Sequence, residues 1–235
     1  MGYCKRVGVI LGVFLVVMVL GVGWDVFLNR MEYVEGNVNV SKCKGRIALT
    51  FDDGPGAYTE ELLDGLRSRG VKAGFFVVGE NVLEHKDLIL RMKKEGHLIG
   101  NHTYSHVMLT SVSKDRASLE VCKTNAILSD IIKDKVLWIR PPYGLWNRNT
   151  QCMENMTIVL WNVDPMDWSV QNTQKVVQHI EANVKDGSVI LLHDIYKTSV
   201  RAALKVIDDL KKEGYEFVRV DEMARKEKKG FYVIQ

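Results

Sequence analysis

Two adjacent carboxylates, Asp52 and Asp53, stand at the end of the apolar run 47–51. If that run is a β-strand, the two side chains point to opposite sides of it and can take different roles. One carboxylate could bind a metal ion while the other accepts a proton from an attacking water, since a nearby cation keeps a carboxylate ionised at neutral pH. Taken alone, Asp-Asp-Gly-Pro is more typical of a polar turn, so other residues must decide between the two interpretations.

A pair of histidines supplies the ligands that a metal site needs. His102 and His106 are four positions apart, so on a helical turn their rings point the same way and can share one ion. With Asp53 as a third ligand, the set is two imidazoles and one carboxylate, with a position left open for water or substrate. The pair by itself is weak evidence, because histidines also occur at this spacing on protein surfaces.

A hydrolase also needs an acid that protonates the leaving group, and His193 follows another apolar run. Either Asp164 or Asp167 could orient its ring. A glycosidase that uses Asp52 and Asp167 as paired carboxylates is an alternative, but it leaves the histidine pair without a task. A phosphohydrolase built on His193 and Asp194 is another alternative, and it lacks further ligands nearby.

Short apolar runs alternate with longer amphipathic stretches after residue 45. The short runs predict strands and the long stretches predict helices. The expected strands are 47–51, 71–78, 98–101, 136–139, 157–162, 188–192 and 217–220, and the expected helices are 58–68, 86–94, 114–132, 173–184 and 198–212. This alternation predicts a mostly parallel α/β sheet or barrel, whose active site gathers at the carboxyl ends of the strands. The polar residues at those ends are Asp52, Asp53, His102, Arg140, Asp164, Asp167 and His193.

The composition is that of an ordinary globular chain of 235 residues with a net charge of +3. Its length fits one domain with an appendage, and we expect a monomer. The small net charge, with basic and acidic residues interleaved, argues against a nucleic-acid partner.

The N-terminus departs from this composition. Lys5 and Arg6 precede the uncharged run 7–24, which as a helix would reach about 27 Å and could span a bilayer. The two cations should stay in the cytoplasm, which places the rest of the chain outside. A cleaved secretory signal is the alternative, and it also exports the domain. The expected organisation is a cytoplasmic tip and transmembrane anchor over 1–24, a stalk over 25–44 and a catalytic domain over 45–235.

Three cysteines follow the expected anchor, namely Cys43, Cys122 and Cys152. At most one disulfide can form among three thiols of one chain, and no spacing here resembles a structural zinc site. Whether Cys122 and Cys152 pair is left open by the sequence.

Five short motifs occur in order along the chain, each at an expected strand end. They are Thr50-Phe51-Asp52-Asp53-Gly54-Pro55, His102-Thr103-Tyr104-Ser105-His106, Arg140-Pro141-Pro142-Tyr143-Gly144, Asp164-Pro165-Met166-Asp167-Trp168 and Leu191-Leu192-His193. This set resembles the polysaccharide deacetylase family, the NodB homology domain of carbohydrate esterase family 4, over about residues 46–220. The resemblance implies a distorted (β/α) barrel of the NodB type with about seven parallel strands.

The resemblance also implies a role for each site residue. Asp52 would be the general base, held in orientation by Arg140. His193 would be the general acid, tuned by Asp167. The metal ligands would be Asp53, His102 and His106, with Zn²⁺ as the expected ion and Co²⁺, Mn²⁺ or Ni²⁺ as alternatives.

Three further residues would bind the reacting group. The backbone N–H of Tyr143 would stabilise the oxyanion, a preorganised electrostatic role. Trp168 and Leu191 would line the pocket for the acetyl methyl group. These assignments rest on the resemblance and not on spacing.

Asp53 bears on the substrate, because some relatives that act on N-acetylmuramic acid have Asn at that place. The expected function is therefore hydrolysis of the amide that joins acetate to N-acetylglucosamine in peptidoglycan, by an extracytoplasmic domain on a single-pass membrane anchor, or a secreted one if the anchor is cleaved. Chitin oligosaccharide, exopolysaccharide and acetylxylan are alternative substrates. A catalytically silent wall-binding module that keeps the fold is an alternative from a different class.

Overall fold

The computed structural model describes residues 43–147, 150–223 and 233–234. Its centre is a sheet in which each strand runs parallel to its neighbours. The strands are β1 (Gly45–Asp52), β2 (Gly74–Val77), β3 (Leu98–Asn101), β4 (Trp138–Ile139), β5 (Thr157–Val159), β6 (Val189–His193), β7 (Tyr215–Phe217) and β8 (Val233–Ile234). Their order is β6-β1-β2-β3-β4-β5-β8, and β7 pairs with the first residues of β1.

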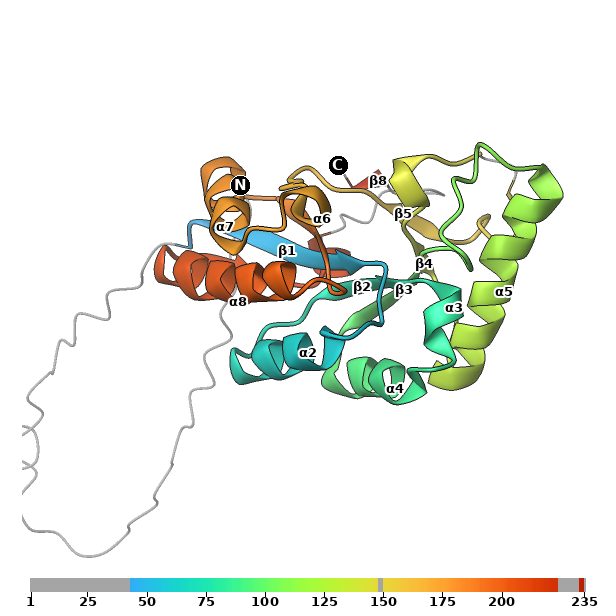
Figure 1. Ribbon diagram of the computed structural model, residues 1–235, viewed down its shortest axis with the longest axis horizontal. Coiled ribbons are helices and arrows are strands. Elements are labelled where there is room, and N and C mark those ends of the chain that lie inside the picture. The colour runs from blue at the N-terminus through green and yellow to red at the C-terminus, as the bar shows by residue number, and fades with distance from the viewer. Residues whose placement is uncertain (1–42, 148–149, 224–232, 235) are drawn as a thin grey trace, which may run out of the picture. The chain divides into compact units, whose positions relative to one another are not determined.

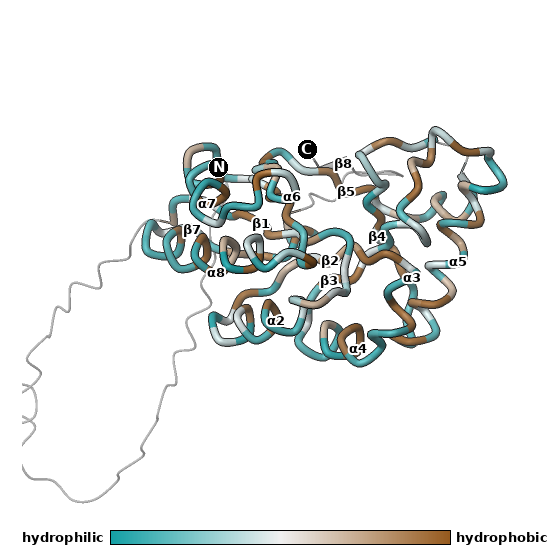
Figure 2. The backbone as a smooth tube through the Cα atoms, viewed as in Figure 1, coloured by the Kyte–Doolittle hydropathy of each residue, from teal (hydrophilic) through white to brown (hydrophobic). Residues whose placement is uncertain are grey.

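Helices connect the strands and cover the sheet. They are α2 (Thr59–Ser68), α3 (Gly79–Val82), α4 (Lys86–Glu95), α5 (Lys114–Ile132), α6 (Asp167–Val170), α7 (Thr173–Asn183), α8 (Lys197–Lys212) and α9 (Val220–Met223). In Figure 1, α2, α4 and α8 lie along one side of the strands, and α5 packs against α4 and β3. Figure 2 shows hydrophobic residues along the central strands and hydrophilic ones on the outer turns of the helices. The core therefore lies between the sheet and these helices, as apolar burial requires.

The register of the strands brings the candidate residues to one rim. Asp52, the last residue of β1, is opposite His193, the last residue of β6. The last residues of β3 and β4 are likewise opposite each other. His102 and Arg140, which follow those two strands, therefore leave the sheet at the same rim.

The expected parallel α/β fold is confirmed, in the form of a curled half-barrel. Each of the five expected helices agrees with an observed one to within a residue at either end. The strand expected over 157–162 is shorter than predicted, since β5 ends at Val159. Beyond it, the N–H groups of Asn162 and Val163 donate to the carbonyl of Val189 on β6, which brings this edge of the sheet towards β6.

The strand expected over 217–220 is mostly wrong, because only Phe217 belongs to β7 and Val220 begins α9. The apolar alternation continues past Phe217, but the pairing with β1 ends there. Strand β8 was not predicted, since a two-residue strand leaves no periodic pattern.

No helix among the described residues is long and apolar enough to cross a bilayer. The expected anchor over 1–24 lies outside the described residues, as does all of the expected stalk except its last two residues. Both remain predictions.

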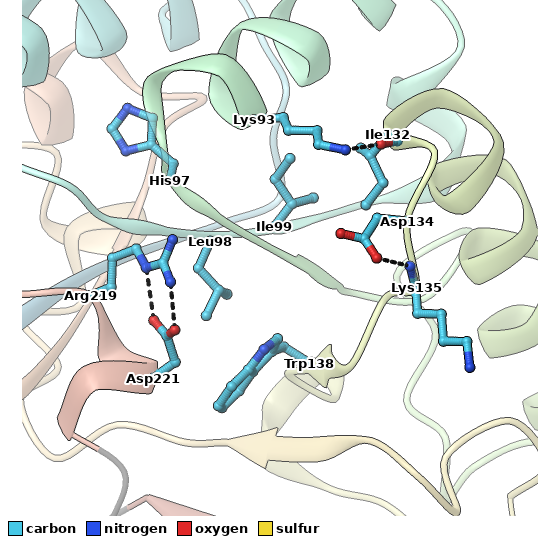
Figure 3. Close-up of a pocket in the computed structure, with 10 residues that line it drawn as sticks. All are labelled: Lys93, His97, Leu98, Ile99, Ile132, Asp134, Lys135, Trp138, Arg219 and Asp221. Atoms are coloured by element: carbon cyan, nitrogen blue, oxygen red, sulfur yellow. Dashed lines mark hydrogen bonds and ion pairs between the residues drawn. The ribbon is translucent and has the colours of Figure 1, made fainter.

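A pocket of about 170 Å³ lies at the other end of the strands, beside Leu98 and Trp138, where β3 and β4 begin. Figure 3 shows that several of its charged side chains already have hydrogen-bond partners. Arg219 donates two hydrogen bonds to Asp221, at 2.9 and 2.7 Å, and the Lys93 ammonium donates to a backbone carbonyl. The candidate chemistry lies at the opposite rim.

Candidate active site

Three side chains from two separate loops converge on one point at the carboxyl rim. Asp53, His102 and His106 each offer a ligand atom, and these atoms all lie within 4.8 Å of one another. Oδ1 of Asp53 is 3.5 Å from Nε2 of His102 and 3.3 Å from Nε2 of His106. That oxygen is buried and has no hydrogen-bond partner among the described residues. A buried carboxylate oxygen without a donor is costly unless a cation satisfies it, so the trio fits a divalent metal.

The two histidines are not on a helical turn, and that expectation is wrong. Residues 102–106 form a loop, in which Thr103 has φ 65° and His106 has φ 54°. The left-handed conformation at these two positions replaces helical geometry and still turns both rings to the same place. The rings of His102 and His106 lie 5.0 Å apart, centroid to centroid.

The tautomer of His102 follows from its contacts. Nδ1 lies 2.6 Å from the backbone carbonyl of Arg140. A carbonyl can only accept, so Nδ1 carries the hydrogen and Nε2 presents a lone pair towards Asp53. This is the state in which imidazole binds a metal.

The protonation of the other two ligands also suits a cation. Burial raises the pKa of Asp53, but the neighbouring histidines, His102 first and then His106 and His193, outweigh it and lower the pKa below its ordinary value. Burial and the charge of His102 lower the pKa of His106. At neutral pH the trio is therefore one carboxylate with neutral imidazole at His106.

The two aspartates do not point to opposite sides, and that expectation is also wrong. Asp53 has φ 71°, so the chain leaves the extended conformation directly after Asp52. Oδ2 of Asp52 is 3.6 Å from Nε2 of His102, and Oδ1 of Asp53 is 3.5 Å from the same nitrogen. Both carboxylates therefore face one site.

Arg140 holds Asp52 by a fixed ion pair. Nη1 of Arg140 donates to Oδ1 of Asp52 at 2.7 Å, and both side chains are buried. The remaining bonds of the guanidinium go to the carbonyls of Val159 at 3.0 Å and Leu160 at 3.1 Å. Three anchored bonds leave the guanidinium one orientation, which sets that of the carboxylate.

Asp167 holds His193 in the same manner from the far side of the site. Oδ1 of Asp167 is 2.8 Å from Nδ1 of His193, and its Oδ2 accepts the backbone N–H of His193 at 2.9 Å. Burial alone would lower the pKa of His193, but the hydrogen bond and charge of Asp167, with the charges of Asp52 and Asp53, raise it to about 9. His193 is thus a cation at neutral pH, with Nε2 3.9 Å from Oδ2 of Asp53. Asp164 instead accepts the backbone N–H of Met166 and does not orient the ring.

The three predicted pocket residues lie on different parts of the rim. Tyr143 has φ 61° and is 59% exposed as a residue, with its ring 5.2 Å from that of His106. Trp168, in α6, is 49% exposed. Leu191 is buried in β6, two positions before His193, so it shares that residue's side of the strand. Exposed aromatic groups beside a buried polar centre are suited to a saccharide that stacks over the site.

The sequence suggested Asp194 only as a partner of His193 in a phosphohydrolase, and in the structure its carboxylate lies against Gly54, in the turn that follows Asp53. Oδ2 of Asp194 accepts the hydroxyl of Thr59 at 2.5 Å, and that hydroxyl accepts the N–H of Gly56 at 2.8 Å. A Cβ at Gly54 would lie 2.3 Å from the Asp194 carboxylate, so only glycine fits there. Burial raises the pKa of Asp194 to about 7. Asp194 therefore supports the turn that carries Asp53.

Comparisons with known proteins agree with this geometry. Residues 39–161 match the polysaccharide deacetylase family. The chain is 38% identical over 202 residues to the peptidoglycan-N-acetylmuramic acid deacetylase PdaC of Bacillus subtilis, a match that covers 86% of this chain and 42% of that protein. It is 39% identical over 193 residues to a peptidoglycan-N-acetylglucosamine deacetylase of Bacillus cereus, covering 79% of this chain and 70% of that protein.

The fold of the domain matches as well. The solved structure of PdaC from Bacillus subtilis superposes with a TM-score of 0.73 at 40% identity, over 77% of this chain and 90% of the solved one. The chain spans about two fifths of the full length of the first curated relatives that it matches. On the family match and the Bacillus cereus relative together, this chain belongs to the polysaccharide deacetylase family, whose members depend on a metal.

Proposed function

We propose that this chain is a metal-dependent hydrolase that removes N-acetyl groups from the amino sugars of a cell-wall polysaccharide. The observation that carries the proposal is that a candidate base and a candidate acid both lie beside the three candidate metal ligands. Asp52 is held by Arg140 on one side, and His193 is held by Asp167 on the other. A base and a protonated acid that face one site are what amide hydrolysis requires.

Asp53, His102 and His106 would hold the divalent metal, for which we propose zinc. When bound, this ion supplies the Lewis acidity that polarises the acetamide carbonyl and makes water more acidic. A two-histidine, one-carboxylate set leaves room for such exchangeable oxygen ligands.

The residues of the chain would carry the proton transfers. Asp52 accepts a proton from water as the water oxygen attacks the carbonyl carbon, and the Arg140 guanidinium keeps the carboxylate aimed at that water. His193 then donates its Nε2 proton to the amide nitrogen, the carbon–nitrogen bond breaks, and the products are acetate and a free amine. The backbone N–H of Tyr143 would donate to the oxyanion, while Trp168 and Leu191 would enclose the methyl group.

The sugar that we propose is N-acetylglucosamine of peptidoglycan. The names of the relatives point in two directions, since one of similar identity is called an N-acetylmuramic acid deacetylase and another an N-acetylglucosamine deacetylase. The presence of Asp53 supports the second assignment. Chitin oligosaccharide, exopolysaccharide and acetylxylan remain the alternatives.

We also propose that the N-terminal apolar run 7–24 anchors the protein to the cell membrane with the catalytic domain outside. The support is the sequence pattern alone, in which two cations precede an uncharged run of bilayer length. An extracytoplasmic domain would meet its wall substrate directly.

Mass spectrometry of muropeptides from cells with and without the protein tests the choice of sugar. The glucosamine residue is expected to lose the mass of an acetyl group less that of the hydrogen that replaces it. Loss on the muramic acid residue would contradict the proposed sugar while leaving the reaction intact. No loss on either sugar would contradict peptidoglycan as the substrate.

A further inference from the structure

The carboxylate of Glu120 lies in the middle of α5 and is almost completely buried, with 1% of the residue exposed. It occupies a face of the helix that is otherwise packed inside, between the buried residues Ala117, Val121 and Thr124. A buried carboxylate is costly unless donors surround it. The groups that donate hydrogen bonds to this carboxylate therefore indicate which part of the structure it stabilises.

Most of those partners come from the loop between the two metal-ligand histidines. Oε2 of Glu120 accepts the backbone N–H of Tyr104 at 2.9 Å and that of Ser105 at 2.7 Å. Oε1 accepts the hydroxyl of Ser105 at 3.0 Å and pairs with Nη2 of Arg116 at 2.6 Å. Three of the four contacts are thus made to residues 104 and 105.

Backbone bonds hold one side of this loop, since the carbonyls of Thr103 and Tyr104 accept the N–H groups of Gly79 and Glu80 at 2.9 Å. Thr103 and His106, on either side of the bound pair, have positive φ values of 65° and 54°. Non-glycine residues adopt this conformation at a cost in free energy, so it persists where the surrounding structure enforces it. The Glu120 carboxylate holds the other side, because it accepts the N–H groups of Tyr104 and Ser105.

The two histidines depend on these bonds unequally. The ring of His102 is fixed by its own hydrogen bond to the Arg140 carbonyl. Among the described residues, no hydrogen bond fixes the ring of His106, which meets Asp53 at 3.3 Å and packs against Tyr143. The position of His106 therefore depends on the backbone before it, where Glu120 binds both the N–H and the hydroxyl of Ser105.

We propose that Glu120 is a positioning residue of the metal site, which sets the distance between His102 and His106 by binding the two N–H groups between them. The inference rests on the proposed function, because it takes the trio to be the metal site. Glu120 touches neither substrate nor metal and acts only through the loop.

The test is metal affinity, measured by competition with a chromogenic chelator on the full chain, together with the absorption spectrum of the Co²⁺-loaded protein. Glu120→Ala should weaken Zn²⁺ binding about 10- to 100-fold, as loss of a residue that orients metal ligands commonly does. Glu120→Gln keeps an amide oxygen that can accept the two N–H groups, so it should weaken binding by less than about tenfold and shift the Co²⁺ bands only partly.

Ser118→Ala is the matched control. Ser118 is also buried on α5, and its hydroxyl accepts the N–H of Gln151, in a different loop. This variant should lose some stability while its Zn²⁺ affinity and Co²⁺ spectrum stay as in the wild type. Equal loss of affinity in Ser118→Ala and Glu120→Ala would show a general effect of loosening α5 and would overturn the inference.

The remaining outcomes are also decisive. Unchanged affinity and spectrum in folded Glu120→Ala would overturn the inference. If Glu120→Ala does not fold, Glu120→Asp decides, because its shorter side chain cannot reach the two N–H groups, and an unaltered Co²⁺ spectrum with unaltered affinity in that variant overturns the inference. A wild-type chain that binds neither metal would contradict the proposed function itself, which separates the two failures.

Discussion

The guanidinium of Arg140 donates a hydrogen bond of 2.7 Å to Oδ1 of Asp52, and both side chains are buried. Arg140 is also bonded to two backbone carbonyls, so it cannot follow a displaced carboxylate. The proposed base is therefore aimed by a fixed charge. Because the Arg140 cation also neutralises a buried charge, the same ion pair should contribute to the stability of the domain.

Asp52→Asn should abolish turnover and leave the metal in place. The amide can still accept from Arg140, but it cannot take a proton from water, so the rate should fall by about 10²- to 10⁴-fold or more. Acetate release gives the rate and elemental analysis gives the metal content. Loss of the metal in this variant would mean that Asp52, and not Asp53, is the ligand.

Arg140→Met should destabilise the domain strongly. Removing the cation leaves the buried Asp52 charge without a partner, which costs about 3 to 5 kcal/mol. Urea unfolding of the two proteins measures the difference.

Arg69→Met is the control for that substitution. Arg69 pairs with Asp208 at 2.8 Å, but the side chains are 28% and 45% exposed, so the loss should be about 1 kcal/mol or less. If both variants lose the same stability, the buried pair has no special cost, and the argument for Arg140 fails.

Asp167→Asn should lower the pKa of His193. In the metal-free protein that pKa is raised to about 9, chiefly by the hydrogen bond and charge of Asp167 acting against burial. With Asn in place of Asp167, burial prevails and the pKa should fall by more than one unit. An NMR titration of the His193 ring nitrogens measures it. A pKa that stays near 9 in the variant would assign the shift to other groups.

The same pair predicts a pH dependence of stability for the metal-free chain. The pKa of His193 in the folded state, about 9, lies above its unfolded value of about 6.5. Its contribution is therefore fully present below pH 6.5 and is lost as the pH rises through 9, with a size of about 3 kcal/mol. Urea unfolding at pH 6 and pH 9.5 should show this loss in the wild type and little of it in Asp167→Asn. Equal losses in the two proteins would contradict it.

The disulfide between Cys122 and Cys152 should stabilise the rim of the site. It joins α5 to the segment after Tyr143, across a sequence separation of 30 residues. Closing a loop of that size lowers the conformational entropy of the unfolded chain, which raises its free energy by about 3 to 4 kcal/mol. The double variant Cys122→Ser, Cys152→Ser should therefore unfold at a clearly lower urea concentration than the wild type. An unchanged midpoint would mean that the bond is not formed in solution.

The elements that carry the site could be predicted from the sequence, because strands and helices alternate with clear periodicities. Asp52, His102, Arg140 and His193 all lie at the ends of strands that were expected there. Parallel strands place such ends at one rim. The carboxylates and histidines that follow the strands then suggest a metal-dependent hydrolase. Which of these residues is the base, which are metal ligands and which is the acid was inferred from the family resemblance.

What could not be predicted depends on backbone conformations and distant partners. The positive φ of Asp53 and His106 has no local signal, because neither residue is glycine. Glu120 did leave a signal, a carboxylate on the inner face of an otherwise well-patterned helix, but its partners are 15 and 16 residues away. The hydrogen bond between Asp194 and Thr59 left no such signal, since the two residues are 135 positions apart.

Acetate release by the full chain from peptidoglycan and from N-acetylglucosamine oligomers tests the central claim most directly. The wild type should release acetate when loaded with zinc, stop after chelation and resume when zinc is restored, whereas Asp52→Asn should release none. A zinc-loaded wild type that binds these saccharides and releases no acetate, from them or from acetylxylan, would contradict the claim and indicate a silent wall-binding module.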